Sequence, residues 1–331
     1  LIREIAPDVI MLHAVYEPEV IRDAGALAPT VAYIHTFYAA CPGLVKLFKR
    51  GEEICRQPFG LGCVPMIYLR RCASARHPRS VARILSRTAA IRAAYVALPR
   101  LIVGSPYMRD LLVQNRYPAG RISLLPPHFV EVGHAPTDVP NAPTPAGPAR
   151  TILFVGRLEI EKGLPYLLQA LKLIKIPVRL QVVGEGTRGA AYRQLAQDMD
   201  LAEQVEFVGW RMGDELDACY QGSTVLAMPF IAPETFGKVG IEALTHGRPV
   251  VAFNAGGIPS WLRDGEYGYL IPVKDVSALA DRLERILSDE DLAQRMGMRG
   301  WEYVRREFAP ETHAERLNEI FSRAREDASH D

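Results

Sequence analysis

The stretch Pro233-Glu234-Thr235-Phe236-Gly237-Lys238-Val239-Gly240-Ile241-Glu242 sets two glutamates eight positions apart on either side of a glycine. Gly237 marks a turn, and the residues that follow it are typical of the start of a helix. The apolar run Val225–Met228 lies a few residues upstream and predicts a buried strand. Strand, turn and helix in this order indicate an α/β fold with a functional site where the strand ends.

A second turn of the same kind precedes it in the chain. The segment Gly156-Arg157-Leu158-Glu159-Ile160-Glu161-Lys162-Gly163 follows the apolar run Ile152–Val155. Arg157 can hold phosphate oxygens with its planar guanidinium, and Lys162 can add a mobile positive charge. Free backbone N–H groups at the other helix start, near Gly237, also favour an anion. The two turns therefore predict a site for a diphosphate.

Glu234 and Glu242 would repel a diphosphate, so we expect them to contact its neutral flanks. Carboxylates accept hydrogen bonds from paired hydroxyl groups. We expect Glu242 to accept from a ribose and Glu234 to accept from a transferred sugar. A site with cations at its centre and hydrogen-bond acceptors on both sides indicates a nucleotide-diphosphate sugar, whose diphosphate lies between a ribose and a sugar.

Both turns resemble those of the retaining glycosyltransferases of family 4, which have the two-domain GT-B fold and share two glutamates separated by seven residues. The resemblance covers most of the chain. Further segments carry it in the same order: Val183-Gly184-Glu185-Gly186, Val205-Glu206-Phe207-Val208-Gly209, Gly247-Arg248-Pro249-Val250-Val251-Ala252 and Gly256-Gly257-Ile258-Pro259. It implies an α/β protein with two doubly wound, Rossmann-like domains that face a cleft.

The resemblance also implies roles for single residues. The residues expected at the chemistry are Arg157, Lys162, Glu234 and His35. His35 follows a predicted strand where relatives place a histidine beside the sugar, and His13 is a weaker second candidate. The residues expected to bind the donor are Glu242, Gly156, Gly184, Glu185, Phe236, Gly237, Lys238, Val239 and Val208. The implied reaction is metal-independent hexosyl transfer with retention of configuration, to a polysaccharide, lipid-linked or small-molecule acceptor.

Composition and spacing predict the domain organisation. The length of 331 residues and a hydrophobic fraction of 48% suffice for two cores. We expect an acceptor-side domain over 1–132, a proline-rich linker over 133–149 and a donor domain over 150–308. By the resemblance, residues 309–331 form a helix that crosses back to the first domain. The first residue is Leu1, and relatives open with a strand and a glycine-rich loop. The chain is therefore expected to lack its amino-terminal segment, and its activity to depend on that segment.

Short apolar runs define the expected elements. In the first half, strands are expected at Val9–Leu12, Val31–Ile34, Leu101–Val103 and Ile122–Leu125, and helices at Pro18–Leu27, Val81–Leu98 and Pro106–Gln114. In the second half, strands are expected at Ile152–Val155, Arg179–Val183, Val205–Val208, Val225–Met228, Val250–Phe253 and Tyr269–Ile271. Beyond Asp289 the pattern is helical and is interrupted at Phe308-Ala309-Pro310.

The charge balance is nearly even, with 39 Lys and Arg against 38 Asp and Glu, and no nucleic-acid partner is expected. No long apolar run or signal peptide is apparent, so a cytoplasmic protein is expected. Residues 41–100 nevertheless hold twelve basic residues against two acidic ones. Arg79, Arg83 and Arg87 recur along one predicted helix. Its basic face is either simply solvated or touches an anionic membrane surface or a phosphorylated acceptor.

Four cysteines, Cys41, Cys55, Cys63 and Cys72, lie in a glycine- and proline-containing region, while Cys219 stands apart. Four thiols can bind zinc or an iron–sulfur cluster. Their spacing contains no C-x-x-C pair, which favours independent thiols.

Three rival functions are weighed against the transferase. The segment Gly184–Gly189 fits a dinucleotide-binding pattern, but it follows the second strand of its domain instead of the first. Asp198-Met199-Asp200 could bind a metal, although a solvated helix end is the simpler interpretation. A non-catalytic module that binds sugar nucleotides or partners, and a sugar-nucleotide epimerase, remain as alternatives of other classes.

Overall fold

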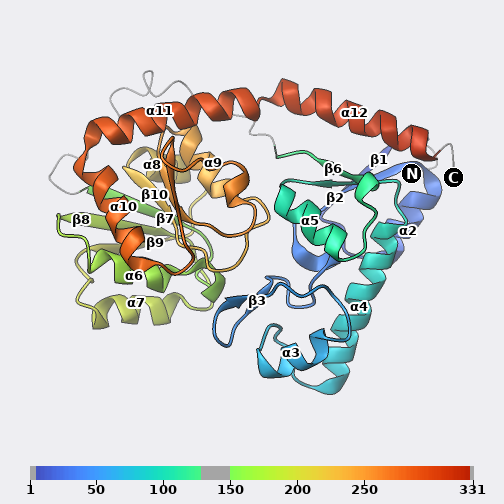
Figure 1. Ribbon diagram of the computed structural model, residues 1–331, viewed down its shortest axis with the longest axis horizontal. Helices are drawn as coiled ribbons and strands as arrows, with labels where there is room; N and C mark the ends of the chain where they lie inside the picture. The colour runs from blue at the N-terminus through green and yellow to red at the C-terminus, as the bar shows by residue number, and fades with distance from the viewer. Residues whose placement is uncertain (1–4, 128–149, 329–331) are drawn as a thin grey trace. The chain divides into compact units, whose positions relative to one another are not determined.

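The computed structural model describes residues 5–127 and 150–328 of the chain, and the linker expected at 133–149 lies outside them. The chain forms two compact units (Figure 1). Unit 1 comprises residues 1–128 and 310–331, and unit 2 comprises residues 129–309. Among the described residues, no helix has both the length and the apolar composition that crossing a membrane requires.

Unit 1 is built on a parallel sheet of four strands in the order β1-β2-β5-β6. The strands are β1 (Ile10–His13), β2 (Thr30–Tyr33), β5 (Arg100–Val103) and β6 (Ile122–Leu124). The helices that cover it are α2 (Pro18–Leu27), α4 (Pro78–Val96), α5 (Pro106–Gln114) and α12 (Pro310–Ala328). A parallel sheet with helices on its faces confirms the predicted α/β class.

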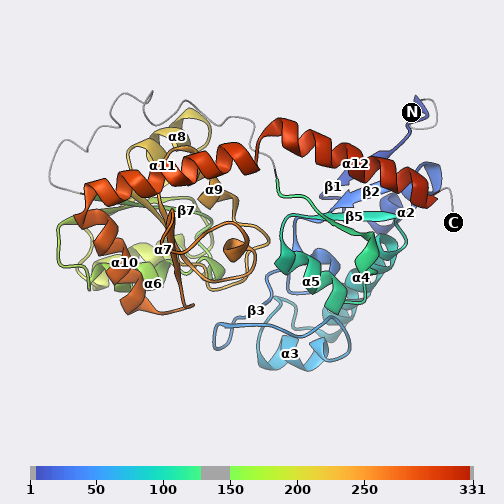
Figure 2. The same ribbon diagram turned by 45° about the horizontal axis from the view of Figure 1, so that its top comes forward.

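Strand β2 shows why the sheet needs helices on both faces. Successive side chains of a strand point to opposite faces. Val31 and Tyr33 accordingly join a cluster with Ile320 and Ala324 of α12. Ala32 belongs to the larger cluster on the other face, which includes residues of α2, α4 and α5. Figure 2 shows α12 lying along the sheet strands of unit 1. The last helix of the chain thus completes the first unit.

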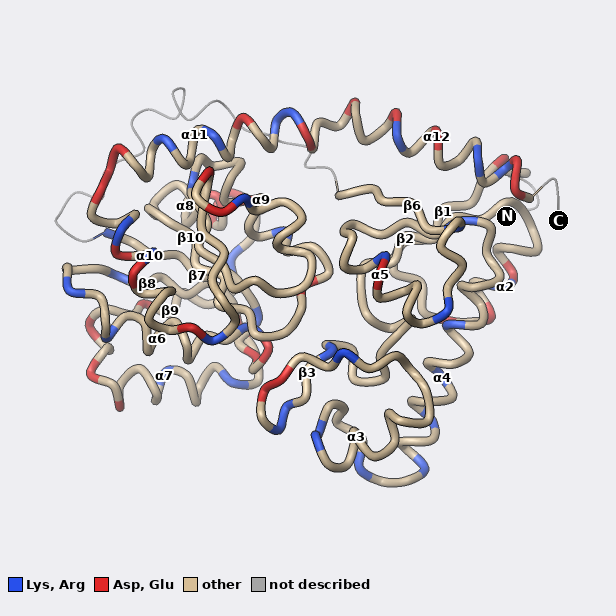
Figure 3. Tube along the Cα trace, in the orientation of Figure 1, with Lys and Arg blue, Asp and Glu red and all other residues tan. Residues whose placement is uncertain are grey.

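A small substructure lies beside this sheet, and the sequence pattern did not predict it. It contains a 3-10 turn η1 (Phe37–Ala39), the antiparallel strands β3 (Leu47–Phe48) and β4 (Glu53–Ile54), and helix α3 (Cys63–Leu69). Ile67, Cys72, Ala73 and Val81 form its buried cluster. Lys and Arg residues lie around α3 and along α4 (Figure 3).

Unit 2 contains a parallel sheet of six strands in the order β12-β11-β10-β7-β8-β9. The strands are β7 (Arg150–Val155), β8 (Val178–Val183), β9 (Val205–Gly209), β10 (Val225–Met228), β11 (Val250–Phe253) and β12 (Gly268–Ile271). The chain begins at the centre with β7, builds outward to β9, and returns to β10 on the other side of β7. This is the doubly wound order, and its switch point lies between β7 and β10.

Six helices connect and cover these strands. They are α6 (Leu164–Leu171), α7 (Gly189–Asp198), α8 (Asp214–Gln221), α9 (Lys238–Thr245), α10 (Val276–Ser288) and α11 (Glu290–Glu307). Helix α6 packs against α10, and α9 packs against α11. Two helices begin with aspartate caps: Asp275 accepts from the backbone N–H of Ala278, and Asp289 accepts from that of Leu292. The central strand is buried throughout at Ile152–Phe154.

Candidate active site

The two turns that the sequence singled out lie on either side of the switch point in unit 2. The turn of residues 156–163 follows β7, and the turn of residues 229–237 follows β10. Strands β7 and β10 are paired neighbours in the sheet. Their carboxyl ends therefore bring together two segments about seventy residues apart, at the edge where doubly wound sheets bind ligands.

Backbone contacts hold these two turns together. The carbonyl of Glu161 accepts hydrogen bonds from the backbone N–H groups of Ile231 at 3.0 Å and Ala232 at 3.3 Å. Gly163 has a φ of 64°, and a Cβ there would lie 1.9 Å from the carbonyl oxygen of Pro229. A side chain at position 163 would force the turns apart, which explains the glycine at the start of α6.

Lys162 and Glu234 form an ion pair between the turns. The Lys162 Nζ lies 2.5 Å from Glu234 Oε1 and 4.0 Å from the centre of the Phe230 ring. The side chains are 15% and 21% exposed, so water screens their attraction less than at an open surface. The carbon stem of Lys162 runs beside Gly156, where a Cβ would lie 3.7 Å from Lys162 Cδ. The structure thus brings together three of the residues expected at the site.

Arg157 lies in the same turn but points its charge to solvent. Its side chain is 61% exposed, and its Nη2 lies 2.9 Å from Oε1 of Glu161. The carboxylate of Glu161 is only 12% exposed, whereas the guanidinium of Arg157 lies largely in solvent. The guanidinium can therefore reach another anion, and Glu161 then loses its charged partner.

The turn after β8 supports the turn after β7. Leu158 N donates to the carbonyl of Glu185 at 2.8 Å, and Gly156 N donates to that of Val183 at 3.0 Å. Gly184 has a φ of 129°, and a Cβ there would lie 2.1 Å from the carbonyl oxygen of Gly156. Glu185 is exposed, and on the next strand Val208 is half-buried. The segment Gly184–Gly189, which fits the dinucleotide-binding pattern, thus supports the turn of residues 156–163 from the neighbouring strand β8. The first turn of the domain, after β7, carries Arg157 instead of this pattern.

The turn after β10 leads directly into α9. Phe236 is buried, and its carbonyl accepts a 2.6 Å hydrogen bond from Nε1 of Trp261. Gly237 caps α9, Lys238 is exposed at its first position, and Val239 is half-buried. The first N–H groups of a helix have no partner within the helix, which suits them to an anion.

Glu242 lies within α9 and has a partner that the sequence did not reveal. The Tyr220 hydroxyl of α8 donates to Glu242 Oε2 at 2.9 Å. Burial raises the pKa of Tyr220 well above its ordinary value, and the charge of Glu242 adds to this shift. Tyr220 therefore keeps its proton and remains a donor to the carboxylate. Nothing in the sequence distinguished this tyrosine from a core residue.

His35, the remaining candidate, belongs to unit 1. It lies just beyond β2, half-buried, and its ring stacks on Tyr33 with 4.0 Å between ring centres. Nε2 of His35 lies 3.0 Å from Nδ1 of His13, which follows from the pairing of β1 with β2. The two histidines that the sequence ranked separately are therefore neighbours.

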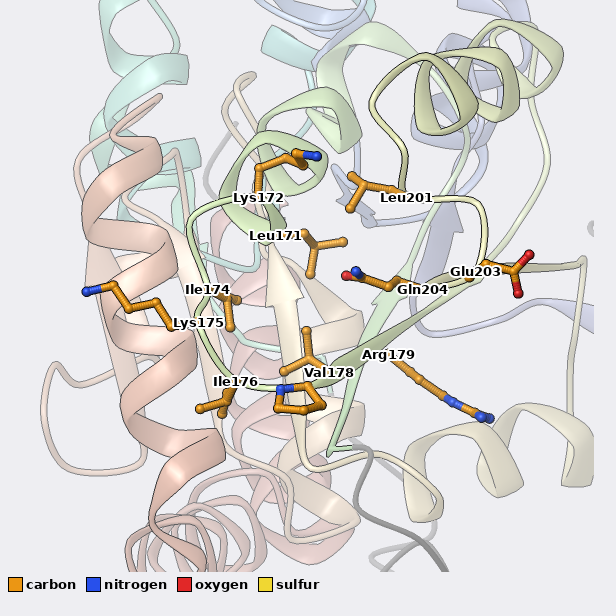
Figure 4. A pocket seen from close by; sticks show the side chains of 11 residues that line it. Leu171, Lys172, Ile174, Lys175, Ile176, Val178, Arg179, Leu201, Glu203 and Gln204 are labelled. Atoms are coloured by element: carbon orange, nitrogen blue, oxygen red, sulfur yellow. The ribbon is translucent and has the colours of Figure 1, made fainter.

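A hollow at the opposite edge of the unit 2 sheet contains none of these residues (Figure 4). It lies where α6 ends and β8 begins. Leu171 and Val178 point toward its centre, whereas the charged ends of Lys175 and Arg179 extend away on opposite sides. Lys172, also exposed there, donates to the carbonyl of Met199.

Comparison with known protein families shows which family the segment around the two turns is similar to. Residues 139–302 match the family model described as "Glycosyl transferases group 1". This segment is similar to the family over 164 of the 331 residues. The matched residues include both turns and all the donor-side candidates. Metal ligation is not apparent in the described residues, where no group of three or more His, Cys, Asp or Glu is arranged around a common ion position.

Curated relatives match part of the length of this chain. A D-inositol 3-phosphate glycosyltransferase of Corynebacterium urealyticum is 36% identical over 180 residues, which are 51% of this chain and 40% of that protein. A GDP-mannose-dependent alpha-(1-6)-phosphatidylinositol monomannoside mannosyltransferase of Mycobacterium tuberculosis is 31% identical over 226 residues, or 64% and 59% of the two chains. The matches thus span roughly half of these relatives.

Solved structures establish the fold. Anabaena HepE in complex with UDP superposes with a TM-score of 0.71 at 18% identity, covering 97% of this chain and 79% of that one. Sucrose-phosphate synthase of Thermosynechococcus elongatus superposes with a TM-score of 0.70 at 24% identity, covering 95% and 73%. The fold of this chain is GT-B, as the sequence predicted.

Proposed function

We propose that this chain carries the donor site of a retaining glycosyltransferase that moves a hexosyl group from a nucleotide-diphosphate sugar. One observation carries the proposal: the Lys162–Glu234 ion pair lies at the switch point of a doubly wound sheet. Such crevices bind ligands, and a cation beside a hydroxyl acceptor matches the junction between a diphosphate and a sugar. The similarity to this family and the names of the relatives support the same class of reaction.

In the proposed mechanism, the donor separates the Lys162–Glu234 pair. The distal phosphate of the donor forms an ion pair with the ammonium of Lys162, and Glu234 accepts hydrogen bonds from the hydroxyls of the sugar. Arg157 leaves Glu161 and adds a second cation to the phosphates. The leaving diphosphate gains negative charge as the glycosidic bond breaks. Both cations therefore stabilise the transition state more than the bound donor, which is the requirement for catalysis.

Glu242 binds the nucleotide ribose in this proposal. Tyr220 occupies one of its carboxylate oxygens, and Oε1 can accept from a hydroxyl. The tyrosine fixes the rotamer of Glu242, so the carboxylate is already oriented before the ribose arrives. Preorganisation of this kind reduces the entropy lost on binding.

Retention follows in this proposal from a front-face displacement. Once the donor has separated it from Lys162, Glu234 contacts the sugar hydroxyls, so the leaving phosphate itself accepts the acceptor's proton. The acceptor is proposed to bind on unit 1, with His35 contacting a sugar hydroxyl. The basic residues 41–100 would hold an anionic acceptor or membrane surface beside it. Equal flotation with neutral and anionic liposomes would exclude the membrane contact.

Thermal denaturation against a panel of UDP-, GDP- and ADP-sugars tests the donor site. A ligand present at about a hundred times its Kd should stabilise the chain by about 2.7 kcal/mol. We expect one nucleotide series to raise the Tm, and the rise to disappear in Lys162→Ala but not in Lys172→Ala. If NADH, and no sugar nucleotide, raises the Tm, the site is a dinucleotide site and the proposal fails.

A further inference from the structure

Four of the five cysteines surround one small cavity in unit 1. Cys41 follows η1, Cys55 follows β4, Cys63 begins α3, and Cys72 lies between α3 and α4. Cys219 lies on α8 of unit 2. The spacing along the chain gave no sign of a common site, yet four separate segments bring their thiols to the same lining.

A buried lysine shares this cavity. Lys46 is 2% exposed, and its Nζ donates to the carbonyl of Gln57 at 2.5 Å and lies 3.9 Å from Sγ of Cys55. Within residues 5–127 and 150–328, no carboxylate forms a salt bridge with this ammonium. A buried charge is costly unless an opposite charge accompanies it. Lys46 belongs to the basic segment 41–100, but its burial sets it apart from the exposed basic residues of that segment.

We propose that the cavity is a zinc site whose ligands are the thiolates of Cys41, Cys55, Cys63 and Cys72. Zinc favours four thiolates in a tetrahedron, and metal binding releases the thiol protons to solvent. The resulting centre carries a net negative charge, which the buried ammonium of Lys46 offsets. In the part of the chain that the structure describes, the four side chains line one cavity but do not surround a common ion position, so the proposal requires them to change rotamer on binding.

The site would tie the substructure of β3, β4 and α3 to unit 1. These elements are short, and their buried cluster is small. A metal centre replaces the core that such a segment is too small to build. The inference does not depend on the proposed transferase activity, because its readouts are metal content and spectra.

Metal analysis of the full chain, purified without chelators, is the first test. We expect about one zinc per chain. After removal of zinc, titration with Co²⁺ should produce the thiolate charge-transfer and d–d bands of a tetrahedral four-sulfur site. Negligible zinc together with no such bands would overturn the proposal. Iron with acid-labile sulfide, or a disulfide among the four residues, would also overturn it.

Variants then locate the site. Cys55→Ser should weaken Co²⁺ binding by at least roughly a hundredfold, whereas the matched Cys219→Ser should leave it unchanged. Lys46→Met keeps all four ligands and should weaken binding by about tenfold, as loss of an outer partner does. Equal Co²⁺ affinity in Cys55→Ser and Cys219→Ser would contradict the ligand assignment. The titration of the unsubstituted chain stays decisive if the Cys55 variant fails to fold.

Discussion

The two edges of the unit 2 sheet carry similar charges and use them differently. At the carboxyl edge, Lys162 meets Glu234 across two turns that share backbone hydrogen bonds. At the amino edge, Lys175 and Arg179 point away from a hollow with apolar walls (Figure 4). The strands are the same, so sheet geometry alone does not make a site. The two edges differ in their connecting turns: those at the carboxyl edge bring a positive and a negative side chain into contact.

The topology explains why this happens at one edge. At the carboxyl ends of β7 and β10 the chain departs in opposite directions from neighbouring strands, which leaves a crevice between the turns. At the amino ends, α6 returns directly into β8. The comparison predicts that matched substitutions at the two edges will differ in activity but not in fold.

Lys162→Ala should give the largest effect. It removes a cation from the leaving group and leaves Glu234 without its partner, so we expect turnover to fall a few hundredfold. Lys172→Ala, the same change at the amino edge, should stay within about twofold of the parent. Steady-state kinetics with the donor found in the panel measure both. Comparable rates for the two variants would remove the distinction between the edges.

Gly184→Ala should destabilise unit 2 by about 3 kcal/mol, because the Cβ would collide with the carbonyl of Gly156 at an unfavourable φ. Gly213 is the control: its φ of 55° is also positive, but no atom lies within 4 Å of a Cβ there. Gly213→Ala should therefore cost less, about 2 kcal/mol, from backbone strain alone. Urea denaturation gives both values. Equal losses would show that backbone strain, and not the contact between turns, sets the requirement for glycine.

Arg157→Ala should lower turnover about a hundredfold, because a cation is lost from the leaving diphosphate. It should also lower the Tm slightly, because the carboxylate of Glu161, which is 12% exposed, loses its partner. Arg179→Ala at the amino edge is the control and should keep its rate. Arg157→Lys should recover part of the activity, since a point charge replaces the planar fork. A parent-like rate for Arg157→Ala would limit the site to Lys162.

Glu242→Ala should give the smallest effect, a loss of about tenfold in nucleotide affinity with little change in turnover. Calorimetry with the nucleoside diphosphate measures it, and exposed Glu203 provides the matched Glu203→Ala control. Tyr220→Phe should lose less, because it removes an orienting bond and not the acceptor itself. Unchanged affinity in Glu242→Ala would exclude the ribose contact.

Much of the fold could be predicted from local sequence patterns. Helices α2 and α5 begin and end at the predicted residues because proline at the first turn fixes their start. Strands β10 and β11 also match, since an apolar run buried on both faces of a parallel sheet has no competing pattern. The hairpin of β3 and β4 was missed, because two-residue strands show no periodicity.

The candidate active site could be predicted only in part from the sequence. Residue types identified the two turns, but the Lys162–Glu234 contact depends on the strand order, which local patterns do not encode. Tyr220 was missed because its burial and its hydroxyl contact arise from packing of α8 on α9. The burial of Lys46 was not predicted, since a lysine in a basic segment carries no signal of burial. What escaped prediction was in each case a contact between distant segments.

The return of α12 to the first sheet makes the two units interdependent in a practical sense. Val31, Tyr33 and Ile102 pack against a helix encoded some two to three hundred residues later. A fragment that stops before Pro310 would expose one whole side of that sheet to water and invite aggregation. Recombination that exchanges one unit between homologues therefore requires two crossover points, and a ribosome must synthesise all of unit 2 and then α12 before the first unit can complete its core.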